Sequence, residues 1–154
     1  MVELKSTLRV FNEAELKANP GVTEGQTQKR LVGFKESPSE RIRMIMASYE
    51  AKSLEELHWH PIETLAFVVS GRGVVRDIEG NAYDVGPGSV VYAPAGISGS
   101  HEWEIKEPLK LIAVRATTDP ERGLQFTVDK HTLSSKIEFN ELLKRGGAHF
   151  KSLY

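Results

Sequence analysis

The sequence of 154 residues contains no cysteine. It can form no disulfide and offers no thiolate, so a transition metal would have to be held by imidazole and oxygen ligands. An excess of charge of one sign is also missing, because 20 Lys and Arg stand against 21 Asp and Glu, which gives a net charge of −1. Without a net field to attract an anionic polymer or lipid surface, we expect neither a nucleic-acid partner nor a membrane partner.

Long hydrophobic runs are absent too. No apolar stretch approaches the roughly 18 residues needed to cross a bilayer, and the first residues, MVELKS, lack the apolar core of a secretion signal. We therefore expect a cytoplasmic protein. The length suits one hydrophobic core, which predicts a single domain over residues 1–154.

Turn residues are frequent, with 13 Gly and 7 Pro. They separate short apolar segments at intervals typical of an antiparallel meander. Many short strands with Gly or Pro between them indicate an all-β barrel or a double-sheet jelly roll. From residue 71 onward, the predicted strands cover residues 74–76, 82–85, 89–93, 101–105 and 109–116.

Helix is predicted only near the two ends of the chain. Asn12, with Glu15 three positions later, forms the pattern of a capping box for a brief helix through Leu16. A second short helix is predicted over residues 139–144. The other predicted segments are strands at 8–11, 30–34 and near 124–128, an extended run over 41–50, and a connection over 52–57.

The most informative stretch is His58-Trp59-His60-Pro61-Ile62-Glu63-Thr64, which continues into a valine-rich strand. Two histidines one residue apart project from the same side of an extended chain and can reach one metal ion. The alternative is that they are two polar residues on a strand edge with no common partner. His101 opens an alternating segment that places His101, Trp103 and Ile105 on one face.

The sequence around these histidines resembles the two motifs of the cupin superfamily. The resemblance covers residues 41–116 and implies a small jelly-roll barrel that holds a divalent metal inside and is commonly a homodimer. The matching residues are His58, His60 and Gly71 in the first motif, and Gly88, Pro94, Gly96 and His101 in the second.

The chain departs from the family pattern at two positions. The spacing back from Gly71 places Thr64 where these proteins usually carry a carboxylate ligand, and Glu63 stands one residue early. Strand alternation turns Glu63 away from the metal if Thr64 faces it, although Pro61 permits a bulge that would change the parity. His101 lies two residues later than the motif expects, which leaves its strand face unchanged because the side-chain period is two.

The site implied by the resemblance consists of three neutral imidazoles from His58, His60 and His101. Thr64 would be a weak or water-mediated fourth contact, and Glu63 a residue at the rim or behind the ligands. Such ligands favour Fe(II), with zinc, nickel, copper or manganese as alternatives, and argue against magnesium or calcium. His131 and His149 lie outside both motifs and are interpreted as ordinary surface histidines.

Aromatic side chains near these positions are candidates for contact with a small-molecule substrate. Trp103 shares a face with His101, and Tyr49 and Tyr92 lie on predicted neighbouring strands. For Trp103 and Tyr92, filling of a narrow barrel is an equally simple interpretation.

The resemblance favours a metal-dependent enzyme acting on a small organic molecule. The chain is similar to cupin dioxygenases that use three histidines and no carboxylate, which favours an Fe(II) dioxygenase. A zinc or nickel isomerase, cyclase or dehydratase would use the same ligands, and a non-catalytic module that binds small molecules is a third alternative. A homodimer is expected because the N-terminal strands find little partner surface in a small barrel, unless they extend the sheet of their own chain.

Overall fold

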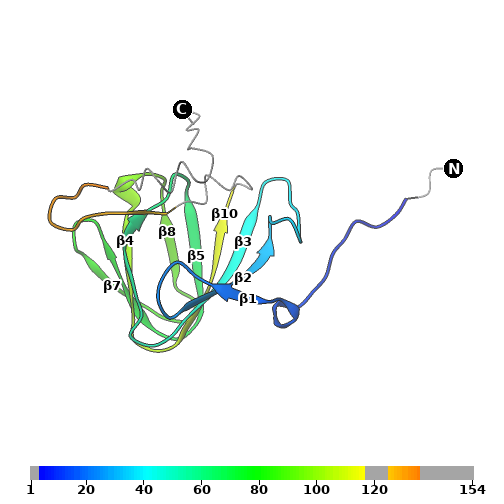
Figure 1. Cartoon of the computed structure of the whole chain (residues 1–154), viewed down its shortest axis with the longest axis horizontal. Helices are drawn as coiled ribbons and strands as arrows, with labels where there is room; N and C mark the ends of the chain where they lie inside the picture. The colour runs from blue at the N-terminus through cyan, green and yellow to red at the C-terminus, as the bar shows by residue number, and fades with distance from the viewer. Residues whose placement is uncertain (1–3, 117–124, 136–154) are drawn as a thin grey trace.

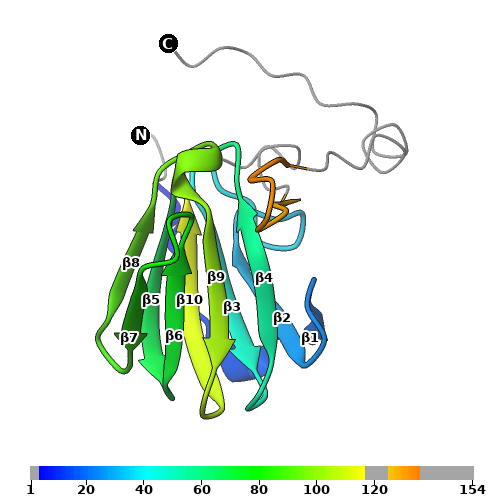
Figure 2. The same ribbon diagram turned by 90° about the vertical axis from the view of Figure 1, so that its left-hand side faces the viewer.

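The computed structural model describes residues 4–116 and 125–135, which form two antiparallel β-sheets that face each other (Figures 1 and 2). One sheet has the strand order β1-β2-β3-β10-β5-β8 and the other β11-β4-β9-β6-β7. The predicted all-β jelly roll is confirmed. The strands are β1 (Ala18–Pro20), β2 (Gln26–Val32), β3 (Arg43–Tyr49), β4 (Leu54–Trp59), β5 (Thr64–Ser70), β6 (Gly73–Asp77), β7 (Ala82–Val85), β8 (Val90–Ala93), β9 (His101–Ile105), β10 (Leu109–Arg115) and β11 (Phe126–Thr127).

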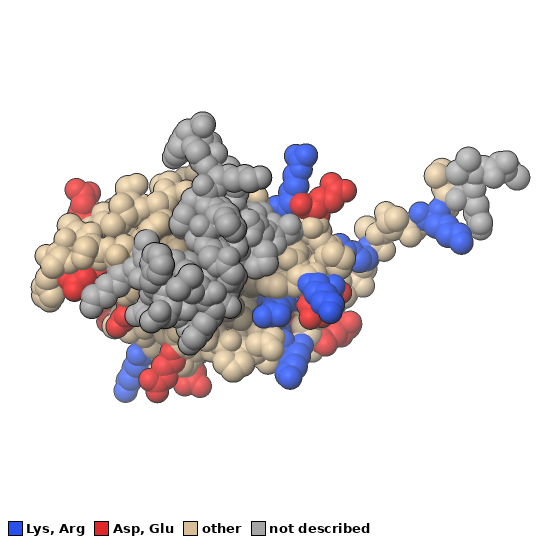
Figure 3. All heavy atoms as spheres, turned by 45° about the horizontal axis from the view of Figure 1, so that its top comes forward, with Lys and Arg blue, Asp and Glu red and all other residues tan. Residues whose placement is uncertain are grey.

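The helical content of these residues consists of two short 3-10 turns, η1 (Glu13–Glu15) and η2 (Ile97–Gly99). None of the helices in the described ranges is long and apolar enough to cross a membrane. Figure 3 shows charged side chains of both signs scattered over one face of the molecule.

The two sheets enclose an apolar core because each strand alternates between inward and outward side chains. In β5, Ala66 and Val68 are buried while Leu65 and Phe67 are about two-fifths exposed. Val68 and Ile105 are among the most completely buried side chains. Each fully buried aliphatic side chain contributes roughly 1.5–3 kcal/mol to stability, so the barrel has a source of stability apart from any metal.

Polar side chains gather where four strands begin or end. β4 pairs with β9 so that His58 lies directly opposite His101. In the other sheet, Thr64 opens β5 and Arg115 closes β10, and these two residues are also paired. The register of the two sheets therefore determines which polar residues can meet.

Several strand boundaries differ from the predictions. The strand predicted over residues 30–34 is β2, which starts earlier at Gln26, and the connection predicted over 52–57 contains most of β4. The histidine segment is interrupted, because β4 ends at Trp59 and β5 begins at Thr64. Pro61 cannot donate to a sheet, and the backbone between the strands is held instead by Gly96, whose N–H donates to the carbonyl of His60 (2.9 Å).

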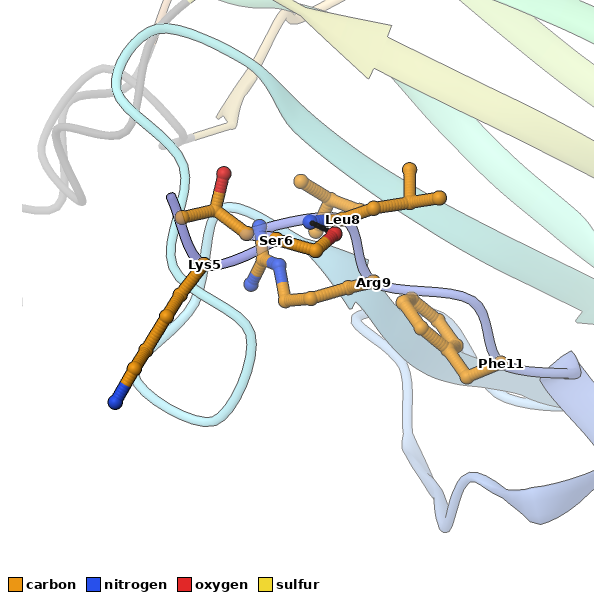
Figure 4. Close-up of a pocket in the computed structure, with 7 residues that line it drawn as sticks. Lys5, Ser6, Leu8, Arg9 and Phe11 are labelled. Carbon is orange, nitrogen blue, oxygen red and sulfur yellow. Dashed lines mark hydrogen bonds between the residues drawn. The ribbon is translucent and has the colours of Figure 1, made fainter. Parts of the chain in front are cut away.

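The N-terminal segment does not form the strand predicted over residues 8–11. Its backbone pairs with no strand, although the Arg9 guanidinium donates to Ser37 Oγ (3.2 Å) and to the carbonyl of Pro38 (2.5 Å). Residues 5–9, Phe11 and Val32 border a cavity of about 660 Å³ (Figure 4). The predicted cap is present, since Asn12 Oδ1 accepts from the Ala14 N–H (2.9 Å) at the start of η1.

At the other end of the chain, β11 confirms part of the strand predicted near residues 124–128. The helix predicted over 139–144 and His149 lie outside the described residues. The N-terminal strands extend the sheet of their own chain, because β1 pairs with β2 and β2 with β3. The argument for a dimer from unpartnered N-terminal strands is therefore wrong.

Gly71, at the turn after β5, is a position where both the backbone conformation and the surrounding space require glycine. Its φ of +82° favours glycine, and a Cβ there would collide with the carbonyl of Pro108. We expect Gly71→Ala to lower the free energy of unfolding by several kcal/mol in chemical denaturation, because left-handed strain and a backbone clash add together.

Gly80 provides the matched control. Its φ of +87° is nearly the same, but a Cβ would meet nothing within 4 Å. Gly80→Ala should therefore cost only the conformational strain, about 1–2 kcal/mol. Equal losses in the two variants would show that the contact with Pro108 is unimportant.

Candidate metal site

Three buried histidines converge at the end of the barrel where β4 ends and β9 begins. His58, His60 and His101 are 2%, 5% and 8% exposed, and each offers a ring nitrogen within 4.8 Å of the others. The ring centroids of His58 and His101 lie 4.4 Å apart, and that of His60 lies 5.0 Å from His58. The structure thus brings together the three predicted ligands, and the alternative of two unrelated edge histidines is wrong.

Backbone carbonyls set the tautomers of two of these rings. His58 Nδ1 donates to the carbonyl of Glu56 (2.7 Å), and His101 Nδ1 donates to the carbonyl of Gly99 (2.9 Å). A carbonyl can only accept, so in both rings the proton is on Nδ1 and Nε2 carries the lone pair. Such a contact orients the ring of a metal-binding histidine and makes it a better ligand.

Burial keeps these two rings neutral at physiological pH. It lowers the pKa of His58 and of His101 from 6.5 to about 4. The backbone hydrogen bonds oppose this shift, but the cost of burying a charged imidazolium is larger. A neutral imidazole is the form that binds a metal, so the donor set fits a first-row transition ion.

His60 differs because Arg115 contacts its Nε2. The Arg115 Nη2 donates to that nitrogen (3.2 Å), and Arg115 Nε donates to Thr64 Oγ1 (3.1 Å). An ion bound through His60 Nε2 would compete with the guanidinium for the same lone pair. Metal binding at this nitrogen therefore requires Arg115 to move toward another acceptor.

A buried carboxylate also lies beside the histidines. Glu55 is 5% exposed, and its Oε1 is 3.8 Å from His58 Nε2. The Tyr49 hydroxyl donates to Glu55 Oε2 (2.6 Å), and Gln26 Nε2 donates to the Tyr49 oxygen (2.6 Å). Burial raises the pKa of the Glu55 carboxyl, while the hydrogen bond from Tyr49 works in the opposite direction.

All these groups line one cavity of about 50 Å³. A single water needs about 10–15 Å³ by this measure, so the cavity accommodates a few atoms, such as an ion with water or the reacting end of a small molecule. Two predicted substrate contacts, Tyr49 and Trp103, line it. The polar lining consists of Gln26, Gln28, Tyr49, Glu55, His58, His60, Thr64, His101, Trp103, Arg115 and Gln125.

Tyr92 does not line this cavity, so its predicted place in the substrate pocket is wrong. It pairs with Leu65 on the outward face of the sheet and is 58% exposed. Its hydroxyl donates to Glu63 Oε2 (2.6 Å), and Glu63 is exposed as well. Strand alternation explains both placements, since Thr64 begins β5 facing inward at 6% exposure. Glu63 is therefore a surface residue, and Thr64 faces the site.

Sequence reasoning missed Glu55, Arg115 and Gln26. Simple alternation places Glu55 on the opposite face from His58, but β4 shifts register between Glu55 and His58, and this irregularity turns both inward. Gln26 lies in a polar, glycine-containing stretch for which the sequence predicts no strand, although β2 begins there. Arg115 could have been found, because it shares its strand face with the buried Leu111 and Ala113.

A jelly-roll barrel with three buried imidazoles at one end is a β-protein that could hold a metal ion. The family model described as "Cupin domain" matches residues 45–115, from β3 to the end of β10. The match confirms the resemblance noted in the sequence.

Solved structures agree on the fold. The polyketide cyclase RemF from Streptomyces resistomycificus is 17% identical, with a TM-score of 0.63 over 71% of this chain and 79% of that one. An RmlC-like cupin from Shewanella frigidimarina is 14% identical, with a TM-score of 0.62 over 77% of this chain and 97% of that one. Salicylate 1,2-dioxygenase from Pseudoaminobacter salicylatoxidans is 15% identical, with a TM-score of 0.55 over 64% and 26%. No curated protein sequence matches the chain.

The buried histidines predict a pH dependence of stability in protein freed of metal with a chelator. Between pH 6.5 and about 4 the unfolded chain binds protons that the folded His58 and His101 do not. The free energy of unfolding should therefore fall as the pH is lowered through this window, by on the order of 3 kcal/mol for each ring. Denaturant titrations at several pH values measure it.

A variant isolates the contribution of one ring. His101→Gln should flatten the curve by about half of the histidine contribution, whereas His131→Gln, at an exposed position, should leave it unchanged. The raised pKa of Glu55 acts in the opposite sense, because it stabilises the fold as the pH falls, so it reduces the histidine effect without changing its sign. Parallel curves for wild type and His101→Gln would contradict the assignment.

Proposed function

We propose that the protein is a metal-dependent enzyme that acts on a small organic anion, and that the reaction is an Fe(II)-dependent dioxygenation. The observation that carries the proposal is the convergence of three buried histidines, two of which have fixed tautomers. His58, His60 and His101 would hold the ion. The bound iron would supply a site at which dioxygen and an electron-rich substrate react.

The charge of the cavity supports an anionic substrate. Imidazole ligands are neutral, so they leave the positive charge of the ion in place, and Arg115 adds a second positive charge to the same lining. A guanidinium binds a carboxylate or enolate through directed N–H groups. Arg115 would bind and orient the substrate anion while Trp103 packs against its apolar part.

Dioxygenation is balanced without a further reductant. Both oxygen atoms of O₂ enter the substrate as a carbon–carbon bond breaks. The protein then has to position an electron-rich anion and keep bulk water away. The buried walls formed by Trp103, Ala66 and Ala113 suit that role.

A second candidate is a zinc or nickel enzyme that catalyses isomerisation, cyclisation or dehydration. The specific observation in its favour is the Tyr49–Glu55 pair, which places a carboxyl group and a phenol in the same cavity as the histidines. Such a pair can take up and return a proton. The polyketide cyclase among the similar structures is an example of the fold with a cyclase activity.

The ligand assignment is tested by alanine substitution. His58→Ala, His60→Ala and His101→Ala should each lower metal content far below that of wild type, while circular dichroism shows a folded barrel, because the apolar core is separate from the ligands. His131→Ala is the control and should keep full metal content. Full occupancy in any of the three variants would remove that residue from the ligand set.

Metal identity and dioxygen use distinguish the two reactions. For protein purified without a histidine tag, elemental analysis should find iron, and turnover of enolisable diketones or aromatic carboxylates should consume O₂ in air and stop under nitrogen. Bound zinc or nickel with equal turnover in air and under nitrogen would instead support the second candidate. A protein that retains no metal from any source would contradict both.

We also propose that the protein is a homodimer. The outer face of β5 and β8 exposes paired apolar side chains, including Phe67 opposite Val90, at 41% and 59% exposure. The N-terminal segment of the same chain exposes Leu8 and Val10 at more than four-fifths. An apolar face and an apolar arm on one chain can cover each other when two copies pair about a two-fold axis.

Sedimentation at micromolar concentration should give the dimer mass for wild type. Phe67→Lys should shift it toward the monomer, because a charge in the interface is costly. Tyr83→Lys, at an exposed position on β7 in the other sheet, is the matched control and should stay dimeric. A monomeric wild type would contradict the proposal.

A further inference from the structure

We infer that Glu55 supplies a fourth, carboxylate ligand to the metal held by His58, His60 and His101. This inference rests on the proposed metal-binding function. The carboxylate would come from β4, three residues before His58, and not from the position after the histidine pair, where Thr64 stands. The local geometry of β4, the contacts of Glu55 and the contacts of Thr64 support this assignment.

The irregularity in β4 is the first observation. In a regular strand, residues three apart face opposite ways. The register of β4 on β9 shifts between Glu55 and His58, and as a result both side chains are buried in the same cavity. Bulges of this kind commonly redirect a side chain beside a functional site. The local structure therefore brings a carboxylate to the histidines at the expense of regular pairing.

The distance and the anchoring of the carboxylate are the second observation. Glu55 Oε1 lies 3.8 Å from His58 Nε2, slightly beyond the separation of about 3–3.5 Å between two ligand atoms that each lie roughly 2.1 Å from one ion. It lies outside the group of three rings whose ligand nitrogens are mutually within 4.8 Å, so coordination would draw the carboxylate inward. The other oxygen, Oε2, accepts from the Tyr49 hydroxyl (2.6 Å), and Gln125 also hydrogen-bonds this carboxylate. A carboxylate has about four acceptor sites, so these contacts orient it and leave capacity for a metal. Ligating carboxylates are typically held in this way.

The third observation concerns the position where a carboxylate is missing. Thr64 Oγ1 accepts from Arg115 Nε (3.1 Å), and the same guanidinium contacts His60 Nε2 (3.2 Å). Arg115 thus occupies the side of the site that Thr64 faces, and no anion from this chain can be supplied there among the described residues. Glu55 is the carboxylate that lines the cavity. With Glu55 bound, the charge at the ion falls by one and Arg115 stays available for an anionic substrate.

Co(II) binding to metal-free protein tests the assignment, because both its affinity and its visible spectrum respond to the ligand set. We expect Glu55→Gln, which keeps the shape and removes the charge, to weaken Co(II) binding on the order of 100-fold and to change the absorption bands. Glu63→Gln removes an exposed carboxylate close by in the sequence and should match wild type in both readouts. Tyr49→Phe should weaken binding less than Glu55→Gln and leave the bands in place.

The outcomes separate this inference from the function on which it rests. Wild-type protein that takes up no Co(II) would overturn the metal-binding function itself. Wild-type binding with unchanged affinity in Glu55→Gln, or with weaker binding but unchanged bands, would overturn only the role of Glu55 as a ligand. Unchanged affinity with loss of turnover would likewise overturn it and place Glu55 in proton transfer. If Glu55→Gln does not fold, Glu55→Asp must show the same weakened affinity and altered spectrum.

Discussion

The pairing of β4 with β9 is the constraint on which the site depends. It places His58 directly opposite His101 and brings their rings to a centroid distance of 4.4 Å. Burial disfavours the charged form of each imidazole, so both rings are neutral at physiological pH. The carbonyls of Glu56 and Gly99 then fix the protons on Nδ1. Backbone geometry, and not a side-chain partner, thus prepares the two Nε2 atoms as ligands.

Other polar side chains of the cavity form two hydrogen-bonded groups, one around Arg115 and one around Glu55. Arg115 and Glu55 carry opposite charges, and an isolated buried charge would cost several kcal/mol. Thr64 and His60 accept from Arg115, while Tyr49 donates to Glu55 and is itself held by Gln26. Because each charge has directed partners, this end of the barrel can remain polar. The apolar core around Val68 and Ile105 stabilises the rest.

This arrangement explains how one barrel can host different chemistries. The fold needs inward apolar residues at alternate positions and turns such as the one at Gly71. Side chains at the ends of the strands need not be apolar, so a threonine can open β5 and an arginine can close β10. Function in such a fold is determined by a few side chains at the strand ends.

The sequence by itself determined the all-β fold and the common face of His58 and His60. These follow from local rules: glycine and proline punctuate short strands, and a side-chain period of two assigns each residue to a face. The resemblance to the cupin motifs added His101, and the choice between Thr64 and Glu63 stayed open until the structure placed Thr64 inward. Strand alternation failed at Glu55. The pairing of β4 with β9 contains an irregularity between Glu55 and His58 that turns both side chains to the same face, and the sequence alone does not show it. Alternation also failed to place Tyr92, because it divides a strand into two faces without saying which face points into the barrel. The pairing of β8 with β5 decides this and turns Tyr92 outward. The contact of Arg115 with His60 joins residues 55 positions apart. Such contacts arise only when the two sheets close, so the tertiary structure decided the charge and the shape of the cavity.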